Sequence, residues 1–572
     1  MRHPTRLPSL VSAALAALAA CHPPPAAPEP EPGVTLHIAA TNDFHGGLYE
    51  AAVKGEEGAF GGLPWLSAAV GSLREEHPDL LLLDGGDCFQ GSWPVNASQG
   101  RGGIEAMALL GVDAAAIGNH EFDYGGVEGA DPLRGALETA AASAPYPLLS
   151  ANIFRADGSR YAPDNIAPWT LLERDGVKIA VVGLTTTETP NTTLPEHVAD
   201  LTFADPVTTV KALLPEIEAS GAQVRILVAH LTGACEPTSY VRNDDACTPD
   251  GEIGRLLTEL PVGTFDAMIL GHAHTVLHHR VGDTFLLEDR SVGHLLGQLE
   301  LVVGPDGVDA DASRVLDPWP IQHPAVDPGC EDRPFPLDPV DVGGHTLAPD
   351  PEALALVDRL EAEAGSLCDE IGCASRTLTR SRQGESELGS WMADAMLASV
   401  EGAEVALQNS GGIRADLPEG AVRRESLQRV MPFDNRIVVL ELTGAELRRA
   451  LRIGTSGAHG VLQIAGASYA YDPARAGGTD LDGDGVVSEW EQDKLCSVTV
   501  GGKPLDDART YKVVTSDFLQ SGGDHLGPAL SAAKVVETGP FIREILWDAA
   551  SNTQGCLGDA PATPRITVGA CK

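Results

Sequence analysis

The stretch Leu80-Leu81-Leu82-Leu83-Asp84-Gly85-Gly86-Asp87 joins a short apolar run to a Gly-Gly turn that ends on a carboxylate. An apolar, strand-like run followed directly by a polar loop occurs five times before residue 275. The runs are 35–40, 80–83, 114–117, 226–229 and 267–270, and the loops hold Asp43-Phe44-His45, Asp84-Gly85-Gly86-Asp87, Gly118-Asn119-His120-Glu121, His230 and Gly271-His272-Ala273-His274. Parallel strands present such loops at the carboxyl edge of a sheet, where open α/β folds bind ligands. The five loops are therefore predicted to meet in one crevice.

The side chains of these loops are typical metal ligands. Asp43, Asp87, Asn119 and five histidines supply nitrogen and oxygen donors for two divalent ions. Imidazole suits transition metals and carboxylate or amide oxygens suit harder ions, so the mixed set indicates a hydrolytic centre. Two such ions about 3.5–4 Å apart need a bridging ligand. Asp87 is the expected bridge, because it follows a strand and the Gly-Gly turn lets the backbone approach closely.

In this order and spacing the motifs resemble the metallophosphoesterase superfamily, and within it the 5'-nucleotidase family of periplasmic UDP-sugar hydrolases and ecto-5'-nucleotidases. The resemblance covers about residues 34–548. It implies a calcineurin-like four-layer α/β/β/α N-terminal domain, a linker helix and an α/β C-terminal 5'-nucleotidase domain. It also implies two ions of the Zn, Mn, Co or Fe class, one held by Asp43, His45, Asp87 and His274, the other by Asp87, Asn119, His230 and His272. His274 departs from the family pattern, because family members often have Gln or Asn at the corresponding position.

The run Gly118-Asn119-His120-Glu121-Phe122-Asp123 contains a second functional element. By resemblance, His120 oriented by Asp123 stabilises the phosphoryl transition state or protonates the leaving oxygen. Such a role requires a cation or acid whose tautomer is fixed by a carboxylate. Glu121 is expected to be structural, and Asp84 to be a turn or supporting group.

The second half is expected to bind the substrate. Residues 302–350 lose regular pattern and are rich in Pro, Asp and Gly, and 351–366 follow as an acidic helix. We expect the catalytic domain over 34–325, a linker with its helix over 326–375, the substrate domain over 376–548 and a tail over 549–572. Within the substrate domain the pattern predicts helices at 389–400 and 444–451 and strands at 437–442, 498–500 and 511–515.

A nucleotide needs aromatic faces for its base and planar donors for its phosphate. Phe433 and Phe518 lie on separate predicted loops, and Asn409-Ser-Gly-Gly412-Ile-Arg414 sets a Gly-Gly turn between an amide and a guanidinium. Taken alone, such residues are more often core and turn residues. By resemblance, however, Phe433 and Phe518 clamp the base and Asp524 faces the ribose. In the same way Arg382, Asn409, Gly412 and Arg414 belong to the phosphate side of the site.

Residues 480–491, Asp-Leu-Asp-Gly-Asp-Gly-Val-Val-Ser-Glu-Trp-Glu, fit every position of an EF-hand calcium loop. The expected ligands are Asp480, Asp482, Asp484, the Val486 carbonyl, Ser488 and Glu491. The loop is single and has no clear helix before it, so a structural calcium ion is expected rather than a sensor. The alternative is an acidic, solvated loop.

The amino terminus has the pattern of an export signal. Arg2 and Arg6 precede an apolar stretch too short to span a membrane, which ends in Leu18-Ala19-Ala20-Cys21. This context resembles a bacterial lipoprotein signal over residues 1–20, with Cys21 lipidated and 21–33 as a Pro-rich tether. An ordinary signal peptide cut after Ala20 is the alternative. We expect a membrane-anchored protein that faces the periplasm or the cell surface.

The formal net charge of −42 argues against a nucleic-acid polymer or anionic lipid as a partner of the general surface. With Cys21 lipidated, nine of the ten cysteines remain in a compartment that permits disulfides. Close spacing suggests the pairs Cys235–Cys247, Cys368–Cys373 and Cys556–Cys571, with Cys330 and Cys496 available to each other. Cys88 is then expected to be a buried free thiol.

The sequence therefore predicts an exported phosphoester hydrolase that releases phosphate from nucleoside 5'-monophosphates and also accepts nucleotide pyrophosphates. One alternative keeps the scaffold but cleaves 2',3'-cyclic nucleotides, with 3'-nucleotidase activity, or UDP-sugars. A remote alternative is a non-enzymatic, calcium-binding surface lipoprotein. That alternative would predict decayed metal ligands, and all seven positions hold competent side chains.

Overall fold

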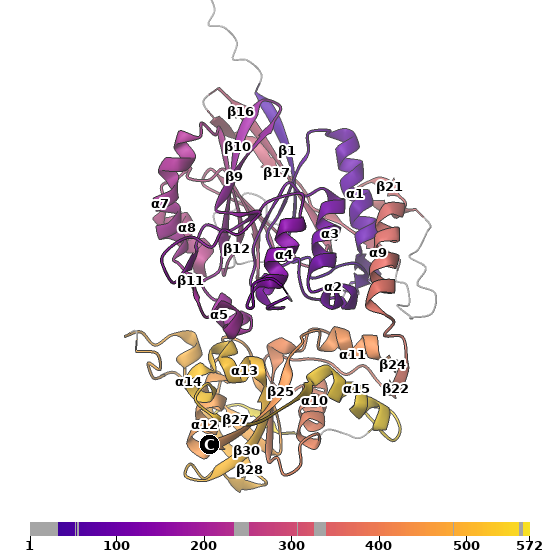
Figure 1. The fold of residues 1–572 in the computed structure, drawn as a ribbon, viewed down its shortest axis with the longest axis vertical. Helices are drawn as coiled ribbons and strands as arrows, with labels where there is room; N and C mark the ends of the chain where they lie inside the picture. Colours follow the sequence, from indigo (N-terminus) through magenta and orange to yellow (C-terminus); the bar gives the residue numbers. More distant parts are fainter. Residues whose placement is uncertain are drawn as a thin grey trace, which may run out of the picture.

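The computed structural model describes residues 33–51, 53, 56–127, 129–233, 251–305, 307–324, 339–483, 485–559 and 564–571. The export signal, Cys21, most of the tether, Cys235–Cys247, Cys330 and Asp484 lie outside this range. Figure 1 shows two domains, one above the other, with α9 (Pro351–Ala364) along the side of the first. Among the described residues, no helix is both long and apolar enough to cross a membrane.

Two β-sheets form the centre of the N-terminal domain. The larger has the strand order β17-β16-β1-β4-β5-β6-β8, with β18 also paired to β16, and the smaller has the order β14-β15-β13-β12-β10-β9. The larger sheet consists of β1 (Val34–Thr41), β4 (Leu81–Asp84), β5 (Ala114–Ala116), β6 (Leu148–Leu149), β8 (Ile166–Ala167), β16 (Leu295–Gly304), β17 (Gly307–Val315) and β18 (Trp319–Pro320). The smaller consists of β9 (Trp169–Arg174), β10 (Val177–Thr185), β12 (Val224–His230), β13 (Ala267–Gly271), β14 (Val276–Val281) and β15 (Thr284–Asp289).

The two sheets pack face to face, and helices cover their outer faces. Alternate residues of β1 and β12, such as Ile38 and Ile226, fill one cluster between the sheets. A second cluster joins the larger sheet to α1 (Leu63–Glu76), α3 (Arg101–Leu110) and α4 (Gly135–Ser143). A third joins the smaller sheet to α7 (Pro206–Ala219) and α8 (Gly251–Glu259). The predicted four-layer α/β/β/α order is thus confirmed.

Within each sheet, the motif-bearing strands run parallel to one another. β1, β4 and β5 run parallel in the larger sheet, and β10, β12 and β13 in the smaller. Their carboxyl ends therefore bring motif loops from both sheets to one edge of the sandwich. Small segments β2 (Glu50–Ala51), β3 (Ala59–Gly61), β7 (Ile153–Arg155), β11 (Leu201–Phe203), α2 (Trp93–Ala97), α5 (Thr189–Thr192) and α6 (Pro195–Val198) complete the domain.

Residues 302–350 are more regular than the sequence suggested. β16 and β17 form a hairpin that ends the larger sheet, and β19 (Gln322–His323), β20 (Val340–Val342) and β21 (His345–Leu347) follow. The expectation of an irregular segment from 302 was therefore wrong, because β17, with its two Asp residues, is a largely exposed edge strand that contributes little to the core. After it, Asp350 caps α9 by accepting a hydrogen bond from the Glu352 N–H, and Val357 and Leu360 pack on the N-terminal domain.

The C-terminal domain is built on a five-stranded mixed sheet with the order β26-β23-β30-β25-β31 and a four-stranded sheet with the order β29-β28-β27-β32. The strands are β22 (Glu370–Ala374), β23 (Val405–Asn409), β24 (Gly420–Arg423), β25 (Arg436–Thr443), β26 (Leu462–Ala465), β27 (Ala467–Tyr471), β28 (Leu495–Val500), β29 (Lys503–Pro504), β30 (Thr510–Ser516), β31 (Lys534–Phe541) and β32 (Ile566–Val568). The helices are α10 (Glu387–Ala398), α11 (Arg424–Val430), α12 (Gly444–Ile453), α13 (Asp517–Ser521), α14 (Gly527–Leu530) and α15 (Ile542–Asn552). β32 pairs with β27, so the last described residues add a strand to this domain.

The disulfides differ from those expected from spacing. Cys373 pairs with Cys556, and Cys496 pairs with Cys571. The expected pairs Cys368–Cys373, Cys556–Cys571 and Cys330–Cys496 were therefore wrong, because the fold brings distant segments together. Cys368 is also disulfide-bonded. Cys88 is free and buried, as predicted.

Candidate dinuclear metal centre

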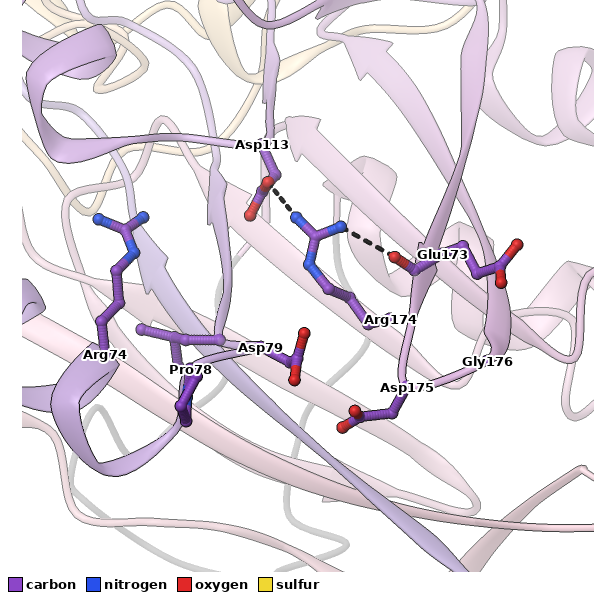
Figure 2. Close-up of a pocket in the computed structure, with 9 residues that line it drawn as sticks. Arg74, Pro78, Asp79, Asp113, Glu173, Arg174, Asp175 and Gly176 are labelled. Carbon is purple, nitrogen blue, oxygen red and sulfur yellow. Dashed lines mark hydrogen bonds and ion pairs between the residues drawn. The ribbon is translucent and has the colours of Figure 1, made fainter.

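The amino edge of the sheets carries a polar hollow that is unrelated to the motif loops. Figure 2 shows its lining, in which Arg174 donates hydrogen bonds to Asp113 and to the Glu173 carbonyl. Asp79 and Asp113 precede β4 and β5, and residues 174–176 form the turn before β10. The hollow thus lies at the opposite edge from the five motifs, and Arg174 and Asp113 in its lining are paired with each other.

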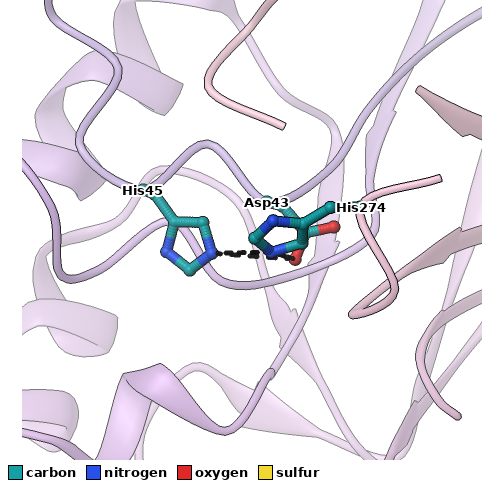
Figure 3. A group of neighbouring side chains, drawn as sticks. All are labelled: Asp43, His45 and His274. Carbon is teal, nitrogen blue, oxygen red and sulfur yellow. Dashed lines mark hydrogen bonds and ion pairs between the residues drawn. The ribbon is translucent and has the colours of Figure 1, made fainter. Parts of the chain in front are cut away.

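At the carboxyl edge, three predicted ligands from two loops converge (Figure 3). Nε2 of His45 lies 3.2 Å from Nε2 of His274. Oδ1 of Asp43 lies 3.2 Å from Nε2 of His274 and 3.8 Å from Nε2 of His45. Their ligating atoms all lie within 4.8 Å of one another. Two imidazole nitrogens and a carboxylate oxygen that face one point are a suitable donor set for a transition metal.

A second group contains Asp43, Asp87 and His230, and Asp43 is common to both groups. Nε2 of His230 lies 2.9 Å from Oδ2 of Asp87 and 3.9 Å from Oδ1 of Asp43. Oδ2 of Asp87 is also 3.8 Å from Nε2 of His45, so this carboxylate lies between the two groups. This is the location that a bridging ligand requires.

Asn119 and His272 extend the second group. Nδ1 of His272 lies 3.1 Å from Oδ1 of Asn119. The amide nitrogen of Asn119 donates to the Thr192 carbonyl at 3.3 Å, which turns the amide oxygen toward His272. The oxygen is therefore oriented as a ligand would be.

The proton positions also suit a metal. Nδ1 of His230 lies 3.1 Å from the Gly85 carbonyl, which can only accept, so that nitrogen carries the proton. In the neutral ring, Nε2 is then a lone pair that faces the Asp87 carboxylate. A lone pair and two buried carboxylates around one point repel one another unless a cation, either a proton or a metal ion, lies between them. The donor set therefore fits the two ions that the sequence predicts.

The pKa shifts have the same origin. Burial alone would lower the pKa of His230, but the Asp87 carboxylate outweighs it and raises the pKa to about 10. Burial and the neighbouring His230 lower the pKa of His272 to about 3. Burial would raise the pKa of Asp43, but His274 lowers it below its usual range. Asp43 is thus held ionised, which is the state that metal binding requires of a carboxylate, whereas a metal ion at His230 has to replace the proton that Asp87 favours there.

The backbone is strained at the ligand positions. Asp43, His45, Asp87, His272 and His274 have positive φ angles of 48°, 44°, 61°, 97° and 55°. Non-glycine residues adopt this region at a cost, and such residues cluster at functional sites. Gly118 is required for a related reason, because a Cβ there would lie 2.1 Å from Oδ1 of Asp87.

The Glu121 side chain joins the Asp87 loop to the Gly118 loop through hydrogen bonds. Its side chain is 1% exposed and accepts hydrogen bonds from the N–H groups of Asp87, Cys88, Phe89 and Gly118 at 3.1, 2.8, 3.1 and 2.6 Å. Asp84 similarly accepts from Oγ1 of Thr41 and the Gly86 N–H. Both carboxylates hold the backbone of ligand loops.

His120 lies beside the metal ligands and is held by Asp123. Nδ1 of His120 is 2.6 Å from Oδ2 of Asp123, whose Oδ1 accepts from the Thr193 hydroxyl at 2.8 Å. Burial opposes protonation, but the Asp123 and Asp87 carboxylates raise the pKa of His120. A positioned imidazolium at this place can stabilise developing negative charge or donate a proton.

The C-terminal domain presents two of the predicted substrate residues to this centre. The Phe433 ring lies 5.8 Å from the His120 ring, and the Arg414 guanidinium lies 5.6 Å from the centre of the Phe433 ring. Burial and the neighbouring Arg382 and Arg380 lower the pKa of Arg414 to about 10. This cluster of guanidinium groups near buried carboxylates is suited to an anionic ligand. Sequence reasoning missed Arg380, although it stands two positions before Arg382.

The other predicted substrate residues form a second group. Nδ2 of Asn409 donates to Oδ2 of Asp524 at 2.8 Å. A Cβ at Gly412 would lie 2.8 Å from Oδ1 of Asn409, so the glycine permits this close turn. Phe518 packs in a different hydrophobic cluster from Phe433, and no ring contact joins the two within the described residues.

The comparisons with known proteins agree with this geometry. Residues 36–276 match the calcineurin-like phosphoesterase family, and residues 364–532 match the 5'-nucleotidase C-terminal domain. Protein UshA of Yersinia enterocolitica is 27% identical over 544 residues, which cover 89% of this chain and 90% of UshA. The crystal structure of a 5'-nucleotidase precursor from Thermus thermophilus is 25% identical, with a TM-score of 0.72 over 94% of this chain and 99% of that one.

The chain therefore combines a calcineurin-like phosphoesterase domain with a 5'-nucleotidase C-terminal domain. Both family domains are present, in the expected order, and each contributes side chains to the same region. The calcineurin-like phosphoesterase match spans all five of the predicted ligand motifs. Cell wall protein Lmo0130 of Listeria monocytogenes is 26% identical over 542 residues, and this chain covers 64% of its length.

The loop at 480–491 brings together part of the predicted calcium set. Ligating atoms of Asp480, Asp482 and Glu491 lie within 4.8 Å of one another. Asp480 accepts from the N–H groups of Gly483 and Gly485 at 2.6 and 3.0 Å, and Glu491 is 3% exposed. Val487, which occupies the position that is usually apolar in an EF-hand loop, is 42% exposed, because no pair of flanking helices in the described chain covers it.

Proposed function

We propose that this chain is an exported, dinuclear metal-dependent hydrolase that releases phosphate from nucleoside 5'-monophosphates. The convergence of Asp43, Asp87 and the ligand histidines with a buried His120 supports this proposal most directly. The adjacent Phe433 and Arg414 from the second domain support a nucleotide as substrate. The name of the Listeria relative, a cell wall protein, supports an extracytoplasmic location.

Each group of side chains has a defined part in this proposal. One ion would be held by Asp43, His45, Asp87 and His274, and the other by Asp87, Asn119, His230 and His272. Two bound divalent ions would supply positive charge that neutralises the phosphoryl oxygens. His120, oriented by Asp123, stabilises the transition state or protonates the leaving oxygen. Arg382, Arg414 and Asn409 bind phosphate beside the Gly412 turn, Asp524 binds ribose, and Phe433 and Phe518 hold the base.

The test is a substrate and metal panel. The purified chain is stripped with a chelator, reloaded with Mn²⁺, Zn²⁺ or Co²⁺, and assayed with AMP, UDP-glucose, ATP and 2',3'-cyclic AMP. We expect the fastest metal-restored phosphate release from AMP. Faster cleavage of UDP-glucose or the cyclic nucleotide would replace the proposed substrate. No metal-restored activity on any of them would refute the enzyme proposal.

Two further assignments belong to this proposal. The 480–491 loop binds a structural calcium ion through Asp480, Asp482, Asp484, the Val486 carbonyl, Ser488 and Glu491. The buried Glu491 carboxylate and its two acidic neighbours support it. Cys21 is lipidated and anchors the protein to a membrane. A Cys21→Ser variant that still partitions with membranes would contradict the anchor.

A further inference from the structure

A second cluster of metal-ligating side chains lies away from the dinuclear centre, at the junction of the two domains. Glu188 stands directly before α5 in the catalytic domain, whereas His459 and His525 belong to the C-terminal domain. Figure 1 shows α5 facing α13 across this junction. Neither the five motifs nor the predicted substrate set includes any of the three residues.

The three side chains have the spacing of ligands. Nε2 of His525 lies 3.2 Å from Oε2 of Glu188, and the rings of His459 and His525 are 5.0 Å apart. One ligating atom from each residue lies within 4.8 Å of the other two. In tetrahedral zinc sites, with bonds of about 2.0–2.1 Å, neighbouring ligand atoms are about 3.3 Å apart. The Glu188–His525 distance matches that value.

An ion pair alone explains only part of the cluster. A protonated His525 would satisfy Glu188, but that pair does not explain why the His459 ring also lies beside His525. Two imidazolium rings side by side would repel each other, whereas two neutral rings suit a shared cation. The side chains are 37%, 27% and 14% exposed for Glu188, His459 and His525, so an ion has access from solvent.

Neighbouring groups hold the cluster in shape. The Trp490 ring stacks on His525 at 4.8 Å and an interplanar angle of 4°. Oδ1 of Asp524 lies 3.8 Å from Nδ1 of His459, and the Asp524 side chain is fixed by Asn409. Such supporting contacts orient imidazole ligands in metal sites.

We propose that Glu188, His459 and His525 form a third metal site, for a zinc-class divalent ion, that links the two domains. Its fourth position is open to water, as in other three-ligand zinc sites. Because the ligands come from both domains, the ion binds only when the domains are arranged as they are here. Binding therefore stabilises this arrangement.

The experiment measures zinc binding to the full chain without nucleotide, so its result is independent of phosphoester hydrolysis. Wild type, Glu188→Gln and His525→Gln are stripped, equilibrated at micromolar free zinc, and analysed for metal content. The matched control is His345→Gln, because His345 also pairs with a glutamate, Glu76 at 3.5 Å, but belongs to no three-residue cluster within the described chain. Hydrogen exchange around α5 and His459 is followed with and without zinc.

We expect Glu188→Gln and His525→Gln to bind one equivalent of zinc fewer than wild type, and His345→Gln to match wild type. Zinc should slow exchange on both sides of the junction in wild type and in the control, and not in the two cluster variants. Equal zinc content in all four proteins would overturn the proposal. Zinc protection that persists in Glu188→Gln would overturn it as well.

Discussion

Glu121 offers the sharpest test of how the metal centre is held together. Its buried carboxylate accepts four backbone hydrogen bonds, two at each oxygen. In Glu121→Gln, one oxygen becomes an NH₂ group that faces two N–H donors. The substitution keeps the size of the side chain and replaces one acceptor atom by a donor.

The expected destabilisation follows from these contacts. Burial raises the pKa of Glu121 to about 7, so the cost is reckoned from the unmade hydrogen bonds rather than from a charge. A buried donor left without an acceptor costs about 1–3 kcal/mol, so two cost about 2–6 kcal/mol. That is a large part of the roughly 5–15 kcal/mol by which domains are stable. Because two of the donors belong to Asp87 and Gly118, the bridging carboxylate should also be displaced, and metal affinity should fall.

Urea unfolding of the metal-free protein measures the free energy of unfolding. Glu218→Gln is the control, since Glu218 is exposed on α7 and its substitution should change stability by less than about 0.5 kcal/mol. Metal content after dialysis reports the state of the centre. A Glu121→Gln protein that loses less than about 1 kcal/mol and retains both metals would show that this reasoning, based on the cost of unmade hydrogen bonds, is wrong.

Four further outcomes are expected. Asp87→Asn should abolish phosphate release under all metals, and a variant that keeps most turnover would exclude a two-metal mechanism. Phe433→Ala should mainly raise KM for AMP, by roughly 5- to 150-fold, because base stacking contributes about 1–3 kcal/mol; an unchanged KM would remove Phe433 from the base site. Millimolar calcium should raise the melting temperature without changing turnover, and Asp482→Ala should lose that response; a calcium-independent melt would contradict the loop assignment. Replacing Cys373 and Cys556 by Ser should lower the free energy of unfolding by about 2–5 kcal/mol, measured by denaturant titration against the oxidised wild type; equal midpoints would contradict this estimate.

Local sequence patterns were sufficient to predict the strands that carry the motifs and several of the helices. The apolar run 80–83 lies on β4 or directly before it, and the helix expected at 444–451 is α12, which Thr443 and Glu446 begin with a capping box. The disulfides could not be predicted in this way. Cys373 and Cys556 are 183 residues apart in sequence, and only the packing of α15 near β22 brings them together.

The sequence by itself determined the chemistry of the centre, because the strand-end loops carry the Asp, Asn and His ligands and parallel strands place those loops at a common edge. Only the tertiary structure decided which side chains meet across the domains. Phe433 reaches His120, and His525 reaches Glu188, through the packing of one domain on the other. No local pattern encodes such contacts, since they depend on the summed geometry of two separate cores.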